Sequence, residues 1–232
     1  MYATSKKNKN LALFDFDGTL CTKDSFTGFI FYALSKRHIV KQGIKILPWI
    51  QAYYLNAYPA HAMRSKLFNA MFTHADALEL QQVALEYATS LMSQLNPALL
   101  KQLKQHQALG HDVVLVSASV DIYLEPVCHL LNIALICTQT EKINNLYTGQ
   151  YTTPDCSSEQ KRQRILENYS LDDYAVIYAY GNSREDNEML ALAHHAYMIG
   201  VNKTLPPLPN SIQMAINFKI FSTLIILDLN NK

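Results

Sequence analysis

The sequence predicts an α/β protein with a Rossmann-like, doubly wound parallel sheet and an all-helical cap inserted after the first strand. Two observations predict this fold. Short apolar runs alternate with helical patterns along most of the chain, which is typical of a parallel sheet with helices on both faces. From about residue 24 to residue 95, only helical periodicity occurs. The 232 residues are 49% hydrophobic and 17% charged, so a sizeable core is expected.

The expected strands are short apolar runs of the kind buried in parallel sheets. The first is LALFDF at residues 11–16, and the second lies within GHDVVLVSAS at residues 110–119. Further runs are IALICT (133–138), YAVIYAY (174–180) and AYMIGV (196–201). Helices are expected between them, over 121–131, 157–169 and 186–195.

A further helix is expected just before the second strand, in NPALLKQLKQHQALG. Asn96 suits the N-cap position, Pro97 the first helical position and Gly110 the position just past the helix end. These signals predict a helix that begins at Pro97 and stops before Gly110.

Residues 24–95 contain four helical stretches, at 26–38, 43–58, 61–72 and 76–95. We therefore expect a core domain of residues 1–23 and 96–232, with residues 24–95 as a helical cap that acts as a lid. The stretch 43–58 is unusually apolar and aromatic. Helix–helix packing is the favoured explanation, and a surface for an acyl chain or a bilayer is the alternative.

Polar residues follow several of the expected strands, where ligands bind in open α/β sheets. Carboxylates, hydroxyls, an ammonium and an Asn/Asp pair together suit a hard cation and a phosphate. Singly, each has a plainer explanation: a turn, a helix cap or a solvated surface lysine. The candidates are Asp15, Asp17, Gly18, Thr19, Ser117, Ala118, Ser119, Lys161, Asn182 and Asp186.

Taken in order, DFDGTL, the serine of VVLVSAS, Lys161 and YGNSREDNEML resemble the four motifs of the haloacid dehalogenase superfamily of phosphatases. The resemblance runs from about Leu11 to about Val201. It is to the branch with a helical cap that includes phosphoserine phosphatases. SASVDIYLEPV and TGQY also look like the branch with phosphoserine-type and phosphatidylglycerophosphate-type phosphatases.

The resemblance implies a role for each motif. Asp15 would be the nucleophile that forms an aspartyl-phosphate, and Asp17 would be the general acid and then the general base. Charge on the phosphate oxygens would be stabilised by binding residues near the nucleophile. The implied phosphate-binding residues are Phe16, Gly18, Ser117, Ala118 and Lys161. The implied ligands of Mg²⁺ are Asp15, Asp17, Asn182 and Asp186.

The fourth motif departs from the family pattern. It usually begins Gly-Asp, whereas this chain has Gly181 and Asn182. An amide oxygen can still coordinate a hard cation, and Asp186 remains as a direct or water-mediated ligand. The expected consequence is weaker metal binding without loss of the reaction.

The sequence thus predicts a Mg²⁺-dependent phosphomonoester hydrolase acting on a small phosphorylated metabolite such as phosphoserine. Asp24 and Arg64 occupy places comparable to the residues that recognise the amino acid in phosphoserine phosphatases. A surface charge on a helix explains Arg64 equally well. A lipid phosphate phosphatase is the first alternative, and a non-catalytic phosphate- or metal-binding relative is the second.

The composition of the chain limits the binding partners and the cellular compartment that we expect. The net charge of +1 gives no electrostatic reason to expect nucleic acid. The four scattered cysteines indicate small buried side chains in a reduced compartment. Neither a signal peptide nor a transmembrane helix is expected, so the predicted location is cytoplasmic, with peripheral membrane contact if the substrate is a lipid phosphate. The apolar segment at 220–229 fits a strand, a packing segment or a weak membrane contact.

Overall fold

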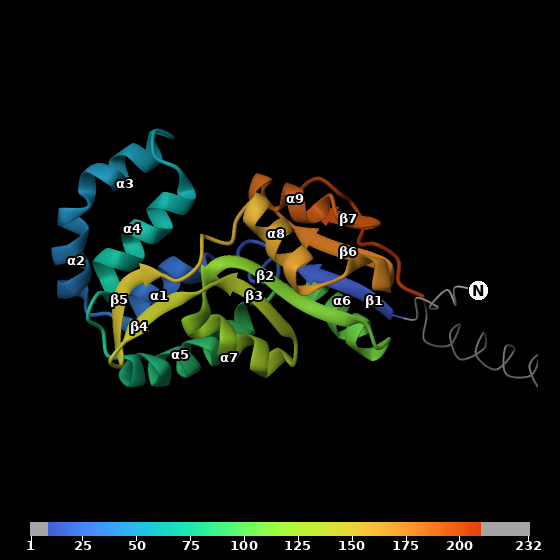
Figure 1. The fold of residues 1–232 in the computed structure, drawn as a ribbon, viewed down its shortest axis with the longest axis horizontal. Helices are drawn as coiled ribbons and strands as arrows, with labels where there is room; N and C mark the ends of the chain where they lie inside the picture. The colour runs from blue at the N-terminus through green and yellow to red at the C-terminus, as the bar shows by residue number, and fades with distance from the viewer. Residues whose placement is uncertain (1–8, 210–232) are drawn as a thin grey trace, which may run out of the picture.

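The computed structural model describes residues 9–209, and the first strand runs through the middle of a five-stranded parallel sheet (Figure 1). The strand order is β3-β2-β1-β6-β7. The strands are β1 (Lys9–Phe14), β2 (Asp112–Val120), β3 (Ala134–Thr138), β6 (Tyr174–Gly181) and β7 (His195–Met198). From β1 the chain first builds one side of the sheet and then the other. The switch point therefore lies where β1 ends, which is where open α/β sheets bind ligands.

Helices cover both faces of this sheet, which confirms the doubly wound α/β prediction. Alternate residues of β1 point to opposite faces. Phe14 packs in the cluster that contains residues of α6 (Pro97–Ala108) and α7 (Asp121–Leu131). Leu13 packs in the cluster formed with α8 (Glu159–Asn168) and α9 (Asn187–Leu190). β1 is thus buried on both sides, as its continuous apolar run predicts.

The helix before β2 begins and ends as its sequence signals predict. The Asn96 side-chain oxygen accepts hydrogen bonds from the amides of Ala98 and Leu99, and Pro97 is the first helical residue. Gly110 has a φ of +72°, a left-handed conformation that glycine adopts without strain.

Five helices follow β1 and make up the proposed cap: α1 (Ser25–Ala33), α2 (Lys36–Lys45), α3 (Leu47–Tyr54), α4 (Ala60–Phe72) and α5 (Ala77–Leu91). The expected single helix at 26–38 is wrong. It is divided because Ser35 has extended backbone and its hydroxyl caps α2 by accepting from the amide of His38.

The chain leaves and re-enters the sheet domain through two adjacent connections. The amide of Asn96 donates to the carbonyl of Leu20 at 2.8 Å, and the amide of Thr22 donates to that of Gln94 at 3.1 Å. This pairing supports the division that we propose between a cap over 24–95 and a core over the remainder.

The sequence interpretation missed a two-stranded antiparallel hairpin, β4 (Thr140–Ile143) and β5 (Leu146–Tyr151). The hairpin packs against α4 in the cap, and Tyr147 exchanges backbone hydrogen bonds with the segment that follows α4.

Helix α9 also differs from the sequence prediction of a helix over 186–195, because it stops at Leu190. His195 already belongs to β7, and the amide of His194 donates to the carbonyl of Ile177 in β6.

Several sequence predictions concern the ends of the chain or its cysteines. The N-terminal segment, for which no signal peptide is expected, lies largely outside the described residues 9–209. The apolar segment 220–229 lies wholly outside them. Cys21, Cys128, Cys137 and Cys156 are all buried free thiols, as expected. Within the described range, no helix is both long and apolar enough to cross a bilayer.

Candidate active site

The carboxyl end of β1 carries two aspartates into a buried turn. Asp15 directly follows the strand, and its amide donates to the carbonyl of Tyr180 in β6 at 2.9 Å. Burial raises the pKa of Asp15 to about 6, although the charge of Lys161 opposes the shift. The ion pair with Lys161 favours the ionised form of Asp15.

Lys161 lies at the base of the site, between two carboxylates. Its Nζ donates at 2.6 Å to Asp15 Oδ1, at 2.6 Å to Asp186 Oδ1 and at 3.0 Å to the carbonyl of Val116. Burial alone would lower the pKa of Lys161, but the two carboxylates outweigh it and raise that pKa above its ordinary value. A permanent positive charge is thus held beside Asp15, in a place where water cannot screen it.

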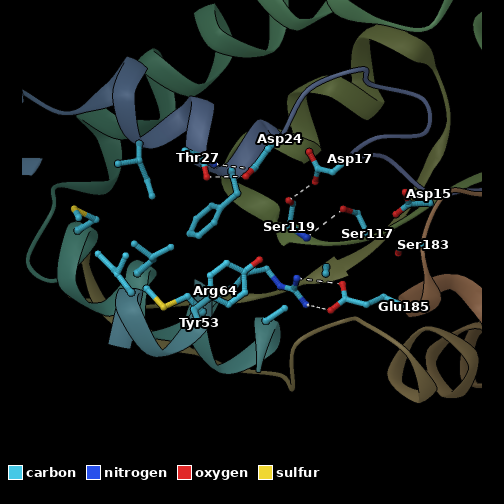
Figure 2. A pocket seen from close by; sticks show the side chains of 18 of the residues that line it. Asp15, Asp17, Asp24, Thr27, Tyr53, Arg64, Ser117, Ser119, Ser183 and Glu185 are labelled. Atoms are coloured by element: carbon cyan, nitrogen blue, oxygen red, sulfur yellow. Dashed lines mark hydrogen bonds and ion pairs between the residues drawn. The ribbon is translucent and has the colours of Figure 1, made fainter. Parts of the chain in front are cut away.

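Asp17 is held by a different set of donors, and its hydrogen bond with Ser119 is drawn in Figure 2. The amide of Ser25, at the start of the cap, donates to Asp17 Oδ1 at 2.6 Å. The hydroxyl of Ser119 donates to Asp17 Oδ2 at 2.6 Å. Burial raises the pKa of Asp17 above its usual value, which favours a carboxyl that can hold and release a proton.

Ser117 and Ser119 lie two residues apart on β2, so both point to the same side at the strand's carboxyl end. Neither serine caps α7, whose N-cap residue is Val120 and which has no side-chain cap. Ser117 Oγ accepts from the amide of Ser119 at 3.1 Å. The Ser117 hydroxyl proton therefore remains available to a ligand, and Ala118 lines the same cavity.

The turn after Asp17 requires glycine and contains an unpaired hydroxyl. Gly18 has a φ of +76°, and a Cβ atom there would lie 2.0 Å from Nδ2 of Asn182. Thr19 Oγ1 is buried and has no hydrogen-bond partner among the described residues. Phe16, the remaining predicted phosphate-binding residue, is fully buried and its carbonyl closes the turn by accepting from Thr19.

The fourth motif brings Asn182 and Asp186 to the wall of the same cavity. Asp186 is almost fully buried, and its Oδ2 accepts from the amides of Asn182 and Ser183, both at 3.0 Å. Its Oδ1 is bonded to Lys161. Asp186 thus organises the loop and the lysine, and this geometry favours a water-mediated role toward a cation over direct ligation.

The donor chemistry around Asp15 fits the magnesium ion that the family resemblance implies. In the part of the chain that the structure describes, no group of three or more His, Cys, Asp or Glu side chains is poised to hold a metal. Lys161 occupies Oδ1 of Asp15, and both Asp15 and Asn182 line the same cavity. Oxygen ligands supplemented by water and a phosphate are the usual environment of protein-bound Mg²⁺.

The two predicted cap residues already have protein partners. Asp24 is the N-cap of α1 and accepts from the amide and the hydroxyl of Thr27. Arg64 of α4 makes paired hydrogen bonds to Asp155, at 2.7 and 2.8 Å, and to Glu185, both at 3.1 Å. Arg64 therefore joins the cap to the core, and the surface-charge interpretation of this residue is wrong.

A cavity of about 570 Å³ extends from Asp15 and Asp17 into the cap. Figure 2 shows Asp15, Asp17, Ser117 and Ser119 on the sheet side, with Tyr53 and Arg64 contributed by the cap. Beyond these polar groups the walls are mainly aliphatic and aromatic. They include Phe26, Ile30, Ile39, Ile50, Met63, Leu67 and Met71.

Comparison with known proteins establishes the family. Residues 12–191 match the model of the haloacid dehalogenase-like hydrolases, so the chain belongs to that family and is a hydrolase of it. This confirms the recognition made from the motifs and the fold that it implies.

Named relatives are similar over most of the chain. A histidinol-phosphatase of Neisseria meningitidis is 26% identical over 79% of this chain and 87% of its own length. A probable phosphatase of Mycobacterium tuberculosis is 27% identical over 87% of this chain and 72% of its own.

Solved structures share the fold. A protein of unknown function from Bordetella pertussis has a TM-score of 0.68 and 23% identity, covering 81% of this chain and 88% of its own. A probable phosphoserine phosphatase from Vibrio cholerae has a TM-score of 0.62 and 15% identity, covering 83% and 56%.

Proposed function

We propose that this hydrolase is a phosphatase that removes a phosphoryl group from a phosphomonoester through covalent attachment to Asp15. The observation that carries the proposal is the position of Lys161, held at 2.6 Å from Asp15 in a buried base. A cation fixed beside the nucleophile supports phosphoryl transfer, which depends on positioning and on stabilising charge at the phosphate oxygens.

In the first step, the Asp15 carboxylate attacks phosphorus, and the bond from phosphorus to the leaving oxygen breaks. Asp17 gives its proton to that oxygen, so the alcohol leaves neutral. In the second step, Asp17 takes a proton from water, and the water oxygen attacks phosphorus. The Asp15–phosphorus bond breaks, which restores the carboxylate and releases inorganic phosphate.

The other residues of the site bind and orient the phosphate. The hydroxyl of Ser117 is proposed to bind an equatorial oxygen, and Lys161 is proposed to stabilise the phosphate charge from beside Asp15, while Ser119 keeps Asp17 in place. Asp15, Asp17 and Asn182 would hold Mg²⁺, with Asp186 behind them. When bound, the ion would neutralise part of the phosphate charge and lessen repulsion between the two aspartates.

Among the substrate classes left open by the sequence, the cavity favours a phosphomonoester with an apolar body. Phosphoserine would need free charged partners for its ammonium and carboxylate groups. Asp24 and Arg64, the two residues expected to provide them, are engaged with Thr27 and with Asp155 and Glu185. The apolar walls instead match an alkyl or acyl chain, which supports the lipid phosphate alternative.

The reaction is tested with a generic aryl phosphate, with and without Mg²⁺. Asp15→Asn should lower kcat by about 10³-fold or more, because the covalent route is lost. Asp172→Asn, an exposed carboxylate change in the core, is the matched control and should retain full activity. Equal rates for Asp15→Asn and the wild type would instead support the non-catalytic alternative.

The substrate class is tested with phosphoserine and a series of monoalkyl phosphates of increasing length. We expect kcat/KM to rise by about fourfold per methylene buried, until the cavity is filled. A preference for phosphoserine over every alkyl phosphate would overturn the apolar-body assignment and leave the reaction itself intact.

A further inference from the structure

The cap segment between Asp24 and Asp76 contains no acidic residue. It contains Lys36, Arg37, Lys41, Lys45, Arg64 and Lys66. The whole chain has a net charge of only +1, so the remainder of the protein is net acidic. Positive charge is thus concentrated in one segment, which indicates an anionic partner for that segment.

The cations of α2 are exposed and surround an apolar strip. Val40 and Ile44 lie one helical turn apart and are 61% and 67% exposed. Arg37 and Lys41 occupy neighbouring positions on the same side of the helix. Among the described residues, no carboxylate forms an ion pair with any of the four cations of α2, including Lys36 and Lys45.

Helix α3 continues this surface with large exposed side chains. Tyr54 and Leu55, at the end of α3, are 78% and 77% exposed. Trp49 is partly exposed, and Lys66 Nζ lies 4.4 Å from the centre of its ring. The packing explanation favoured for residues 43–58 is therefore wrong for much of this stretch, because many of its apolar side chains face solvent.

The two helices form the outer tip of the cap. Figure 1 shows α2 and α3 at the extreme edge of the molecule, on the far side of α4 from the sheet. The same helices contribute Ile39, Ile50 and Tyr53 to the wall of the cavity that leads to Asp15. One side of the helix pair is thus exposed, while the other lines the proposed substrate cavity.

We propose that the α2–α3 surface, meaning the exposed side chains of residues 36–55, docks on an anionic lipid bilayer. Aliphatic and aromatic side chains would enter the interface, while the cations meet lipid headgroups. The docking proposal stands on this surface alone. Its corollary, that the docked cap receives amphiphilic phosphomonoesters, rests on the proposed function.

The charge and the apolar side chains of this surface favour an anionic bilayer over a second copy of the chain and over nucleic acid. A symmetric contact between two copies of α2 would bring cations against cations, which is repulsive. Nucleic acid would leave the exposed aliphatic strip of Val40, Ile44 and Leu55 without a partner. An anionic bilayer satisfies both the charges and the apolar side chains.

The test is flotation of the full chain with phosphatidylcholine vesicles, with and without phosphatidylserine. Wild type should bind the anionic vesicles and be released by salt. Lys41→Gln combined with Lys45→Gln should weaken binding by about 25-fold, or about fivefold per cation. Lys101→Gln with Lys104→Gln, which removes two exposed lysines from α6 in the core, is the matched control and should bind as wild type does.

A second variant tests the apolar contribution. Val40→Ser combined with Ile44→Ser changes only exposed side chains, and it should also release the protein from anionic vesicles. Absence of wild-type binding, equal loss in the α2 and α6 lysine variants, or wild-type self-association that the α2 changes abolish would overturn the proposal. Asp15→Asn protein should bind vesicles like wild type, so a failure of docking is distinguishable from a failure of catalysis.

Discussion

Gly18, in the turn that follows Asp15 and Asp17, lies close to the side chain of Asn182. Gly18→Ala should destabilise the protein by about 1–2 kcal/mol through its positive φ, and a Cβ there would also displace the Asn182 side chain. We expect kcat/KM to fall by about tenfold or more as the site is distorted. Stability is measured by urea unfolding and activity with an aryl phosphate.

Gly110→Ala is the matched control for this change. Its φ of +72° imposes similar backbone strain, but nothing lies within 4 Å of the added Cβ. It should lose similar stability and keep its activity. Equal losses of kcat/KM in the two variants would show that the contact with Asn182 has no role.

Asn182 is the residue at which this chain departs from the usual fourth motif. Asn182→Asp restores a charged oxygen and should lower the Mg²⁺ concentration for half-maximal activity by about tenfold, because ligand charge tunes cation affinity. The measurement is a Mg²⁺ titration of initial rates. Asn132→Asp, placed before β3 at the other end of the strands, adds the same charge and should leave the titration unchanged.

Sequence reasoning at the residue scale worked where a motif dictates chemistry and was weaker where partners come from distant segments. The motifs identify Asp15, Lys161 and Asp186, and the structure brings them together. The motifs do not predict the hydrogen bond from Ser119 to Asp17. The spacing of two from Ser117 on a strand was the available signal, since it places both hydroxyls on one side.

At the scale of elements, α4 is tied to the core by Arg64. Arg64→Ala should lower the unfolding free energy by about 2 kcal/mol, since it leaves the buried carboxylate of Asp155 unpaired. We expect faster amide exchange in α4 as the cap loosens, measured by hydrogen–deuterium exchange.

Arg162→Ala is the control for this change, because its ion pair with Glu159 is exposed and contributes little. Unchanged exchange in α4 after Arg64→Ala would contradict the role of Arg64 as a link between cap and core.

Local sequence patterns do not predict the hairpin β4–β5. Its strands are short, and the first is largely polar, so no apolar run marks it. Its turn does carry a signal, because Asn144 and Asn145 both have positive φ, and paired asparagines favour a two-residue hairpin turn. The hairpin's place beside α4 depends on tertiary contacts that no local pattern encodes.

At the scale of the whole molecule, the sequence predicted the class of sheet but not its strand order. Apolar runs identify β1, β2, β3, β6 and β7, because buried parallel strands need continuous hydrophobic residues. The order β3-β2-β1-β6-β7 depends on how the intervening helices pack, which the pattern alone does not determine.

A buried chain of hydrogen bonds under the site links the far end of the sheet to its catalytic rim. The amide of Val176 donates to Asn10 Oδ1, so Asn10 Nδ2 donates to Nε2 of His111. His111 must then donate from Nδ1 to Nδ1 of His106, which donates from Nε2 to the hydroxyl of Tyr180. Both histidines are therefore neutral.

The packing of Tyr180 connects these hydrogen bonds to the turn that begins at Asp15. Its ring stacks on Phe14 at 4.3 Å between centroids, and Phe14 directly precedes Asp15. Neutral histidines therefore support the strand end that carries Asp15.

Stability should consequently decrease in acid. Burial lowers the pKa of His106 to about 3 and also lowers the pKa of His111. The pKa of His106 is near 6.5 in the unfolded chain and about 3 in the folded protein. Between these pH values the unfolded chain binds more protons than the folded protein does, so the free energy of unfolding decreases as pH falls. The contribution of His106 should change by at most about 1.4 kcal/mol per pH unit in this window.

His106→Gln removes the titrating ring while keeping a polar side chain, so it should flatten the pH dependence of the unfolding free energy between pH 6 and 4. The free energy is measured by urea unfolding at each pH, and the slope of the variant is subtracted from that of wild type to cancel the carboxylates. His61→Gln, an exposed change on α4, should leave the slope as in wild type. Identical slopes in the His106 variant and wild type would mean that the native state accepts a proton in this cluster without cost.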